Sequence, residues 1–331
     1  MPERGKQKRE VICIGGGLAG LSAAIYLARA QRDVLVIDAG DSLARWEPRV
    51  ENYLGFPDGI AGDELLVRGR KQAETYGAVF VGDDIVEAAL HGKEFELKGK
   101  KGTYRAGRVL LATGLLHIPP EIPSVSECLG HSMFFCKDCD GVRVRDRRIA
   151  IMGHNNDAVE YALGVLHYSP CVIVATNGHE PKWSPDHGRW LEEYEIDVHT
   201  RKVIDVEHVK GELKSLGFED GKRVLLDSLF TTRGDVFHNK LACLLGAELD
   251  REGQIQVDLC MRTSVPGLYA AGCITPANCQ MIIAAGQGAA AGQSINRDLF
   301  EESLRNHSLR RFRAKQLSTC ETKPEVIQDP G

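Results

Sequence analysis

The chain has 331 residues, with 41 lysines and arginines against 46 aspartates and glutamates, so its formal net charge is −5. This charge excludes the strongly basic surface typical of nucleic-acid-binding proteins, and we expect no nucleic-acid partner. Apolar residues make up 43% and charged residues 26%, an ordinary globular mixture, and at about 150 residues per domain the length predicts two domains.

The chain shows no sign of membrane insertion or export. No run reaches the roughly 18 apolar residues that a membrane-spanning helix needs, and the charged residues 1–10 do not have the apolar middle of a signal peptide. We therefore expect a cytoplasmic protein without a membrane partner. In that reducing compartment, most of the ten cysteines are expected to be buried thiols.

The first predicted unit is a strand, a glycine-rich turn and a helix. Val11 to Ile14 reads as a strand, and the apolar residues from Leu21 to Ala28 recur at helical spacing. Asp33 to Ile37 follows as a second strand that ends at Asp38. This order predicts a β-α-β unit. Weaker strand signals follow at residues 79–81, 95–97 and 109–111.

A second unit of the same kind is predicted after the proline-rich segment 118–123. Ile149 to Met152 reads as a strand, residues 158–163 as a helix and Cys171 to Ala175 as the next strand. Short strands continue to Gly234, and a helix rich in small residues is expected at 282–295. Two such units predict an α/β protein with duplicated nucleotide-binding folds, the second inserted into the first.

The first turn carries a dinucleotide-binding pattern. Gly15, Gly17 and Gly20 fit G-x-G-x-x-G between a strand and a helix, which is the context that the pattern requires. The first glycine makes the tight turn, the second admits a pyrophosphate to the helix N-terminus, and the third allows close packing. Asp38 lies 18 residues after Gly20, close to the spacing expected for an acid that binds a ribose hydroxyl.

A Cys-x-x-Cys pair is the chemical centre of the sequence. Cys136 and Cys139 can close a disulfide and open it again, and Asp140 beside the second thiol is placed to move a proton. A metal site would usually need a second Cys-x-x-Cys or a histidine pair, and Cys128 with His131 does not supply one. We therefore expect thiol redox chemistry and no metal.

Taken together, these residues resemble the low-molecular-weight thioredoxin reductases, a family of flavoproteins, from about Val11 to about Leu299. Residues 50–57 resemble the family's V-E-N segment beside the flavin, and residues 112–114 resemble its A-T-G turn. Residues 136–141 match the redox motif C-x-x-C-D-G, which is the most specific signal. Residues 267–272 with Gln280 match the C-terminal flavin segment.

The resemblance implies a fold, a cofactor and a role for each thiol. The fold is α/β with two Rossmann-like, three-layer ββα nucleotide-binding domains, the second inserted in the first. Residues 1–117 and 246–317 would form the FAD-binding domain, residues 118–245 the inserted redox and NAD(P)H-like domain, and residues 318–331 a mobile tail. Cys139 would be the flavin-side thiol, Cys136 the thiol that meets an external disulfide, and Asp140 the proton donor. A homodimer is also implied.

The residues expected to bind FAD come from both ends of the chain. They are Gly15, Gly17, Leu18, Ala19, Gly20, Asp38, Asn52, Thr113, Gly114, Gly272, Cys273, Gln280 and Met281.

The second nucleotide motif departs from the family pattern G-x-G-x-x-A. Asn155 stands where the family has the glycine that admits the pyrophosphate, so a side chain fills that space. Ala175, Thr176 and Asn177 stand where the family has H-R-R, and no guanidinium remains to hold a 2′-phosphate. We therefore expect that NAD(P)H is not the electron donor. The alternative is that Lys182 or His179 binds NADPH.

Cys273 is the second departure, because the family has aspartate there beside the flavin. A thiol is a weaker hydrogen-bond partner, and Cys273 could be a third redox thiol near the cofactor. A small space-filling role is the simpler interpretation, and we expect it.

The basic residues 308–315 leave two interpretations open. Like charges at this density usually mark a solvated helix face. Alternatively, they dock an acidic electron donor such as ferredoxin or flavodoxin, or contact a bound phosphate. Whether the altered cleft of the inserted domain holds a second nucleotide or flavin is a separate question that the sequence leaves open.

The expected function is that of an FAD-dependent dithiol–disulfide oxidoreductase that uses Cys136 and Cys139 on a thioredoxin-like protein or another dithiol or disulfide. One alternative is an NADPH-dependent thioredoxin reductase with an altered clamp. Another is a dithiol oxidase that passes electrons to oxygen. A third is a flavin-bound redox sensor without turnover.

Overall fold

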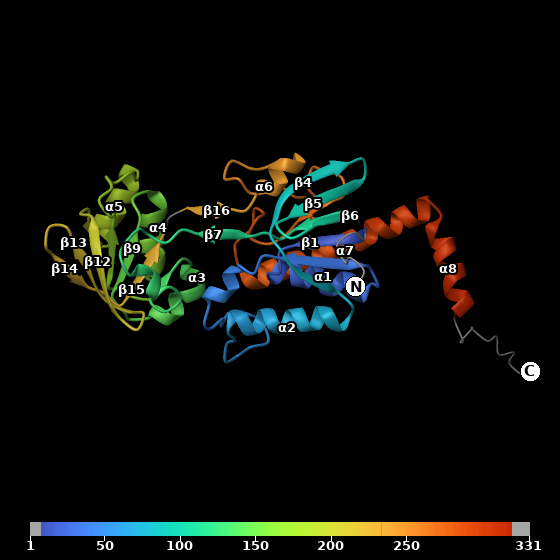
Figure 1. Ribbon diagram of the computed structural model, residues 1–331. Helices are drawn as coiled ribbons and strands as arrows, with labels where there is room; N and C mark the ends of the chain where they lie inside the picture. Colours follow the sequence, from blue (N-terminus) through green and yellow to red (C-terminus); the bar gives the residue numbers. More distant parts are fainter. Residues whose placement is uncertain (1–7, 233, 320–331) are drawn as a thin grey trace, which may run out of the picture.

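The computed structural model describes residues 8–232 and 234–319, which form two lobes joined by two strands (Figure 1). The joining strands, β7 (Leu115–His117) and β16 (Asp235–Phe237), pair antiparallel. One lobe contains both ends of the described chain, and the other is formed by the segment between β7 and β16. The predicted insertion of one nucleotide-binding fold into another is confirmed, while the exact domain limits stay a prediction.

A parallel sheet forms the centre of the first lobe. Its strands, in spatial order, are β3 (Val79–Gly82), β2 (Val34–Asp38), β1 (Arg9–Ile14), β6 (Thr103–Leu111) and β17 (Leu268–Ala270). The first half of β6 also pairs antiparallel with β5 (Glu94–Gly99), and β5 pairs antiparallel with β4 (Ile85–His91). The strands predicted near residues 11–14, 33–37, 79–81, 95–97 and 109–111 are all present, with ends shifted or extended.

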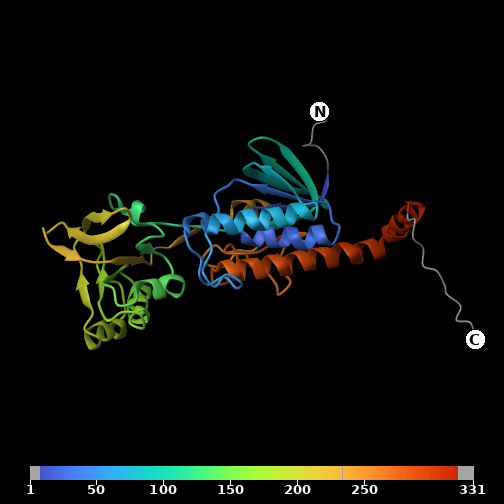
Figure 2. The ribbon, with the colours of Figure 1, turned by 90° about the horizontal axis from the view of Figure 1, so that it is seen from below.

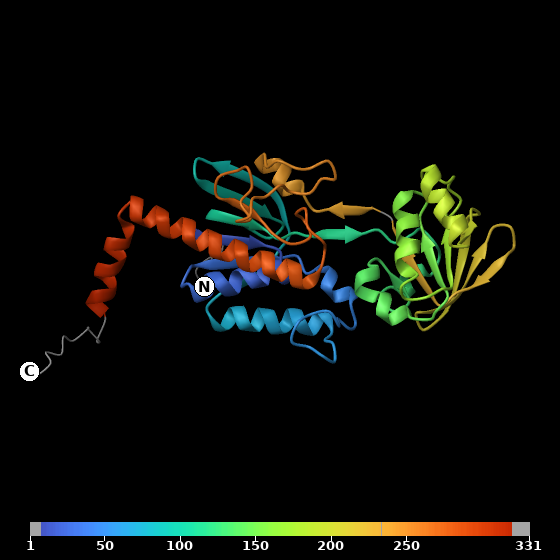
Figure 3. The same ribbon diagram turned by 180° about the vertical axis from the view of Figure 1, so that it is seen from behind.

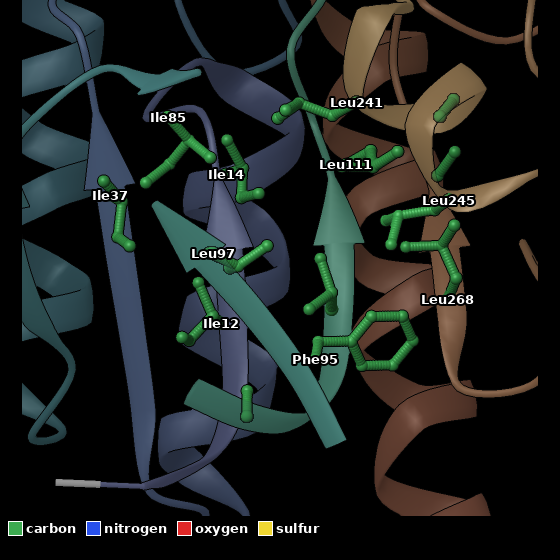
Figure 4. Close-up of a cluster of buried hydrophobic side chains, with 14 of the residues drawn as sticks. Ile12, Ile14, Ile37, Ile85, Phe95, Leu97, Leu111, Leu241, Leu245 and Leu268 are labelled. Atoms are coloured by element: carbon green, nitrogen blue, oxygen red, sulfur yellow. The ribbon is translucent and has the colours of Figure 1, made fainter. Parts of the chain in front are cut away.

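Side chains of the parallel strands alternate between two cores, one on each face of the sheet. Ile12 and Ile14 join a cluster beneath the β4–β5 hairpin and α6 (Lys240–Leu245), which Figure 4 shows with Phe95 and Leu97. Val11 and Cys13 point the other way, into a cluster with α1 (Leu18–Arg29). Because both faces of the sheet are covered, the central strands are apolar without interruption. The sheet and the two layers that cover it make up the three layers expected from the sequence.

Three helices cover the second face of this sheet side by side, as Figure 2 shows: α2 (Gly62–Thr75), α1 and α7 (Met281–Arg305). A Cβ on Gly288 would lie 2.1 Å from the Ala19 carbonyl oxygen, and one on Gly292 would lie 2.9 Å from that of Ala23. The small residues of α7 therefore allow it to pack closely against α1 along this stretch.

The inserted lobe repeats the β-α-β pattern. Its parallel sheet has the order β11 (Asp197–His199), β10 (Val172–Ala175), β9 (Ile149–Met152), β15 (Ser228–Thr231) and β8 (Met133–Phe134). The helices are α3 (Lys137–Asp140), α4 (Asn156–Val165) and α5 (Pro185–Glu193). An antiparallel sheet adds β12 (Val203–Val209), β13 (Glu212–Phe218) and β14 (Arg223–Leu225). The predicted second unit is therefore confirmed as β9, α4 and β10.

The C-terminal helix α8 (Ser308–Thr319) bends away from the end of α7, at the far end from the inserted lobe (Figure 3). Its arginines at 310, 311 and 313 are exposed. None of the helices in the described ranges is long and apolar enough to cross a membrane. The predicted mobile tail lies outside the described residues from position 320 onward.

Candidate functional site

A cavity of about 630 Å³ lies where the carboxyl ends of β1, β6 and β17 face the inserted lobe. This is the position at which open α/β sheets bind ligands, because the loops after parallel strands meet there. Every predicted catalytic or cofactor residue lines this cavity except Gly20. The structure thus brings together residues from both ends of the chain and from the inserted lobe, and their individual roles stay predictions.

The first glycine motif has the geometry that a dinucleotide cradle requires. Gly15 has φ +107°, and a Cβ there would lie 2.2 Å from the Ala112 carbonyl oxygen. A Cβ on Gly20 would lie 1.9 Å from the Gly15 carbonyl oxygen, so Gly20 acts through packing and not as lining. The nearest atom to a Cβ on Gly17 is the Ser42 hydroxyl at 3.4 Å, so Gly17 has space on its cavity side.

Two helix N-termini face the same cavity. Gly17 begins α1 and Gln280 begins α7, and neither helix has a side-chain cap at this end. Uncapped first-turn N–H groups and the helix dipole both favour an anionic ligand. Asp38 accepts a hydrogen bond from the Gly16 backbone N–H at 2.9 Å and borders the cavity. These features fit the pyrophosphate and ribose of FAD.

The Cys136–Cys139 disulfide forms the wall of the cavity on the side of the inserted lobe. Cys136 precedes α3, and its sulfur accepts the Cys139 backbone N–H at 3.2 Å. The Gln280 amide nitrogen donates to Cys139 Sγ at 3.0 Å and to Cys136 Sγ at 3.3 Å. Asn52 donates to Gln280 Oε1 at 3.0 Å, so it orients this amide. Hydrogen bonds of this kind stabilise a thiolate when the disulfide opens.

Two half-buried tyrosines fix the backbone on both sides of the disulfide. The Tyr161 hydroxyl donates to the Phe135 carbonyl oxygen at 2.7 Å and accepts the Lys137 N–H at 2.8 Å. Burial raises the pKa of Tyr161 to about 12, so it stays a neutral donor. A Cβ on Gly141 would lie 2.3 Å from the Tyr168 ring, which explains the glycine after Asp140.

Two carboxyl groups, Asp140 and Glu47, lie beside the disulfide and share Arg143. Arg143 donates to Asp140 at 2.9 Å and lies 3.9 Å from Glu47. Burial raises the pKa of Asp140 above its usual range, although Arg143 opposes the shift. Burial, and then the negative charge of Asp140, raise the pKa of Glu47 to about 7. This pair can hold and move protons near neutral pH.

Cys273 is bonded to Cys279 in a second disulfide that also lines the cavity. The expected space-filling role of Cys273 is therefore wrong, because residues 274–278 turn back and bring the two sulfurs together. The wider expectation of buried thiols is also wrong. Of the nine described cysteines, four are in disulfides, and only Cys13 and Cys128 are buried free thiols.

The second glycine turn is filled by the protein's own side chains. Asn155 begins α4, and its side-chain oxygen accepts the Ala158 N–H at 3.3 Å. Thr176 is buried and donates to the His179 carbonyl oxygen at 2.6 Å, while Asn177 accepts the Val203 N–H at 2.9 Å. Thus two of the three residues at the H-R-R positions hold neighbouring turns.

Sequence reasoning missed several residues of the site. Glu47, Arg143, Tyr161 and Cys279 carry no local motif, and the structure alone places them at the disulfides. The one available signal was the Cys-x5-Cys spacing of Cys273 and Cys279 around the flavin segment. The groups gathered here define a nucleotide-dependent dithiol–disulfide oxidoreductase.

Comparison with known proteins agrees with this geometry. Residues 9–290 match the pyridine nucleotide-disulphide oxidoreductase family. The thioredoxin reductase of Listeria innocua is 31% identical, covering 87% of this chain and 93% of its own. That of Streptomyces coelicolor is 32% identical, covering 86% and 91%.

Solved structures show the same likeness. HlmI has a TM-score of 0.86 at 28% identity, covering 93% of this chain and 98% of its own. A thioredoxin reductase of Bacillus anthracis has a TM-score of 0.83 at 30% identity, covering 89% and 99%. The chain belongs to the pyridine nucleotide-disulphide oxidoreductase family and is a thioredoxin reductase-like FAD flavoprotein, a flavin-dependent disulfide oxidoreductase.

Proposed function

We propose that this enzyme exchanges electrons between FAD and a dithiol or disulfide partner through Cys136 and Cys139, and that NADPH is not its electron donor. The observation that carries the claim about NADPH is the position of Asn155. Its side chain caps the helix whose first N–H groups would otherwise receive a pyrophosphate. Thr176 and Asn177 support the proposal, since both are engaged in turns and neither can grip a 2′-phosphate.

The chain's own residues divide the thiol chemistry between them. A partner thiolate that attacks Cys136 Sγ breaks the disulfide and releases Cys139 as a thiolate beside the Gln280 amide. When bound in this cavity, FAD would supply reversible two-electron chemistry. Gln280 holds Cys139 Sγ at the wall of this cavity, and Asn52 orients Gln280. The predicted roles of the two thiols thus have a physical basis.

Protons move through the carboxyl pair, in which Asp140 is buried and Glu47 is half-buried. A released thiolate needs a proton, and Asp140 adjoins Cys139 in the chain and lines the same cavity. The raised pKa of Asp140 makes it a carboxylic acid that binds a proton more readily than an exposed aspartate does. Glu47, with a pKa of about 7, can resupply that proton from the cavity. Arg143 lowers the pKa of both carboxyl groups and so partly offsets the effect of burial.

An anaerobic titration tests the choice of donor. The purified holoenzyme is mixed with NADPH at micromolar concentrations, and the flavin absorbance is followed. We expect no rapid bleaching with NADPH, whereas dithiothreitol should reduce the flavin through Cys136 and Cys139. Rapid bleaching by NADPH would overturn the proposal. The Cys139→Ser variant should lose disulfide exchange with a thioredoxin-like protein partner and keep its flavin spectrum.

A second candidate is an NADPH-dependent enzyme with an altered clamp. The observation in its favour is the stacked pair His154 and His179, whose ring centroids lie 4.6 Å apart beside the second glycine turn. Exposed Lys182 adjoins them through its backbone N–H, which donates to the His154 carbonyl oxygen at 2.6 Å. The same titration separates the two candidates, because a cationic cluster that binds NADPH would allow flavin reduction.

The donor and assembly are part of this proposal. The exposed arginines of α8 provide a positive surface for an acidic ferredoxin- or flavodoxin-type donor. The altered cleft of the inserted lobe is the place for a second nucleotide or flavin, and the quantity of flavin released per chain tests this directly.

The disulfide partner is a thioredoxin-like protein, and the enzyme is a homodimer. Sedimentation analysis tests the dimer.

A further inference from the structure

The Cys273–Cys279 disulfide lies between two cavities. Both cysteines line the flavin cavity, and Cys279 also lines a second cavity of about 450 Å³. Leu115 and Phe237 are shared in the same way, so a thin wall separates the two spaces. The second cavity is bordered by exposed Pro276 and Asn278. A thiol from solvent can therefore reach Cys279 without entering the flavin cavity.

The loop between the two cysteines is held in place without the disulfide. The Thr275 N–H and hydroxyl both donate to the Gly272 carbonyl oxygen at 2.9 Å. The Gln254 side chain donates to the Thr275 carbonyl oxygen at 3.0 Å, and the Ile255 N–H donates to that of Ile274 at 2.8 Å. Cross-linking so short a loop removes little chain entropy. Reduced thiols would therefore remain side by side, ready to close again.

This disulfide is also next to the first one. Gln280 follows Cys279 directly, and its side chain donates to both sulfurs of Cys136–Cys139. The two disulfides thus meet the flavin cavity on either side of one glutamine. We infer that Cys273–Cys279 is a second redox-active disulfide, which exchanges electrons at the second cavity with a small external dithiol that carries no net negative charge.

The charge preference comes from the residues around the second cavity. Asp235 and Glu252 line it and are exposed, and none of the described residues that line it is a lysine or arginine. An anionic thiol such as glutathione is repelled there, and a cationic thiol is attracted. With one charge at roughly 8 Å in a mostly aqueous medium, each carboxylate changes the rate by about threefold.

The exchange balances without a further reactant. A donor thiolate attacks Cys279 Sγ, the bond to Cys273 breaks, and Cys273 leaves as a thiolate. The donor's second thiol then displaces Cys279 from the mixed disulfide. The donor loses two electrons and two protons, and the protein gains two thiols. With FAD bound in the adjoining cavity, this pair would close again by passing two electrons and two protons to it, a final step that rests on the proposed function.

Differential alkylation tests the exchange itself. The holoenzyme is equilibrated without oxygen in graded ratios of reduced to oxidised dithiothreitol, quenched in acid, alkylated and analysed by peptide mass spectrometry. We expect Cys273 and Cys279 to become labelled together while the protein stays folded, as judged by its far-ultraviolet circular dichroism. A Cys273–Cys279 bond that stays closed while Cys136–Cys139 opens would overturn the inference and leave the proposed function standing.

Electron counting provides the second measurement. Dithionite titration should consume one two-electron equivalent per chain more in the wild type and in the Cys243→Ser control, which removes an exposed free thiol, than in the double variant Cys273→Ser, Cys279→Ser. Equal consumption by the wild type and the double variant would contradict the inference. Loss of the equivalent that belongs to Cys136–Cys139, seen in Cys136→Ser, would report on the proposed function instead.

The substrate class is tested with two monothiols of opposite charge. Cysteamine should open Cys273–Cys279 faster than glutathione does at equal thiolate concentration. Glu252→Gln should raise the glutathione rate by about threefold and leave the rate of cysteamine, whose thiolate form carries no net charge, nearly unchanged. The exposed Glu87→Gln, on β4, is the matched control and should change neither rate. Equal rates for the two thiols in the wild type would overturn the charge preference.

Discussion

The Gln280 amide nitrogen lies 3.0 Å from Cys139 Sγ, although 141 residues separate them in the chain. The same nitrogen reaches Cys136 Sγ at 3.3 Å. One side chain from the C-terminal flavin segment thus touches both sulfurs of a disulfide in the inserted lobe. This contact joins the redox pair to the cofactor cavity, and it gives the first prediction.

Gln280→Ala should slow the opening of Cys136–Cys139 by about tenfold, because a hydrogen bond to a forming thiolate is lost. Stopped-flow measurement of flavin reduction by dithiothreitol checks the rate. Asn52→Ala should have a smaller effect, since Asn52 only orients Gln280. Equal rates in Gln280→Ala and the wild type would show that the contact does not assist the reaction.

Asp140→Asn should lower the rate of disulfide exchange by about a hundredfold, the usual loss when a general acid is removed. Asparagine keeps the volume but cannot transfer the proton. The flavin absorbance and the thermal midpoint serve as folding controls. A rate within a factor of two of the wild type would exclude Asp140 as the proton carrier.

Glu47→Gln should flatten the pH dependence of exchange between about pH 6 and pH 8, because Glu47 has a pKa of about 7. The rates of the variant and of Glu87→Gln, an exposed control, are compared across this range. A wild-type profile in Glu47→Gln would assign the titration to another group.

Stability should also depend on pH through Glu47. The folded pKa of about 7 lies above the unfolded reference of 4.5, so the folded state binds more protons. The stabilisation is complete below about pH 4.5 and is lost as the pH rises through about 7. Above pH 7, the free energy of unfolding of Glu47→Gln should therefore exceed that of the wild type by about 1 kcal/mol, a value reduced because the side chain is one-third exposed. Urea unfolding measures this difference.

The glycine motif gives a matched pair of variants. Gly20→Ala should not fold to a stable protein, because its Cβ would lie 1.9 Å from the Gly15 carbonyl oxygen. Gly17→Ala should fold, since the nearest atom is 3.4 Å away, but should bind FAD more weakly as the methyl group enters the cavity. Circular dichroism measures folding, and the released flavin per chain measures binding. Full FAD occupancy in Gly17→Ala would contradict this assignment.

Asn155→Ala should lower the free energy of unfolding by about 1 kcal/mol, the usual cost of losing a helix N-cap. Urea unfolding followed by circular dichroism measures it. Asn155→Gly should cost less, because glycine is tolerated at that position. An unchanged stability in Asn155→Ala would mean that the side chain is not acting as a cap.

Much of the fold could be predicted because its signals are local. Val11 to Ile14 and Ile149 to Met152 are continuous apolar runs, as buried parallel strands must be, and each is followed by a glycine turn. The motif residues fell on one cavity for the same reason, since the loops after parallel strands meet at one edge. Strand ends and the length of α7 were less accurate, because caps and packing set them.

The disulfide of Cys273 could not be predicted from its neighbours. Its pairing with Cys279 depends on a turn that Thr275 and Gln254 hold, and Gln254 comes from a different segment. The same is true of Glu47, whose raised pKa follows from burial beside Asp140. No sequence pattern links Glu47 to Asp140, so their proximity could not be predicted.

The sequence by itself determined the class of this protein, because a glycine-rich turn after a strand, uninterrupted apolar strands and a Cys-x-x-Cys-Asp-Gly motif each express a short-range physical requirement. Only the tertiary structure decided which groups meet at the redox centre. Gln280 reaches the sulfurs, Glu47 approaches Asp140, and Cys279 lies between two cavities, since these contacts depend on how two lobes joined by a pair of strands come together.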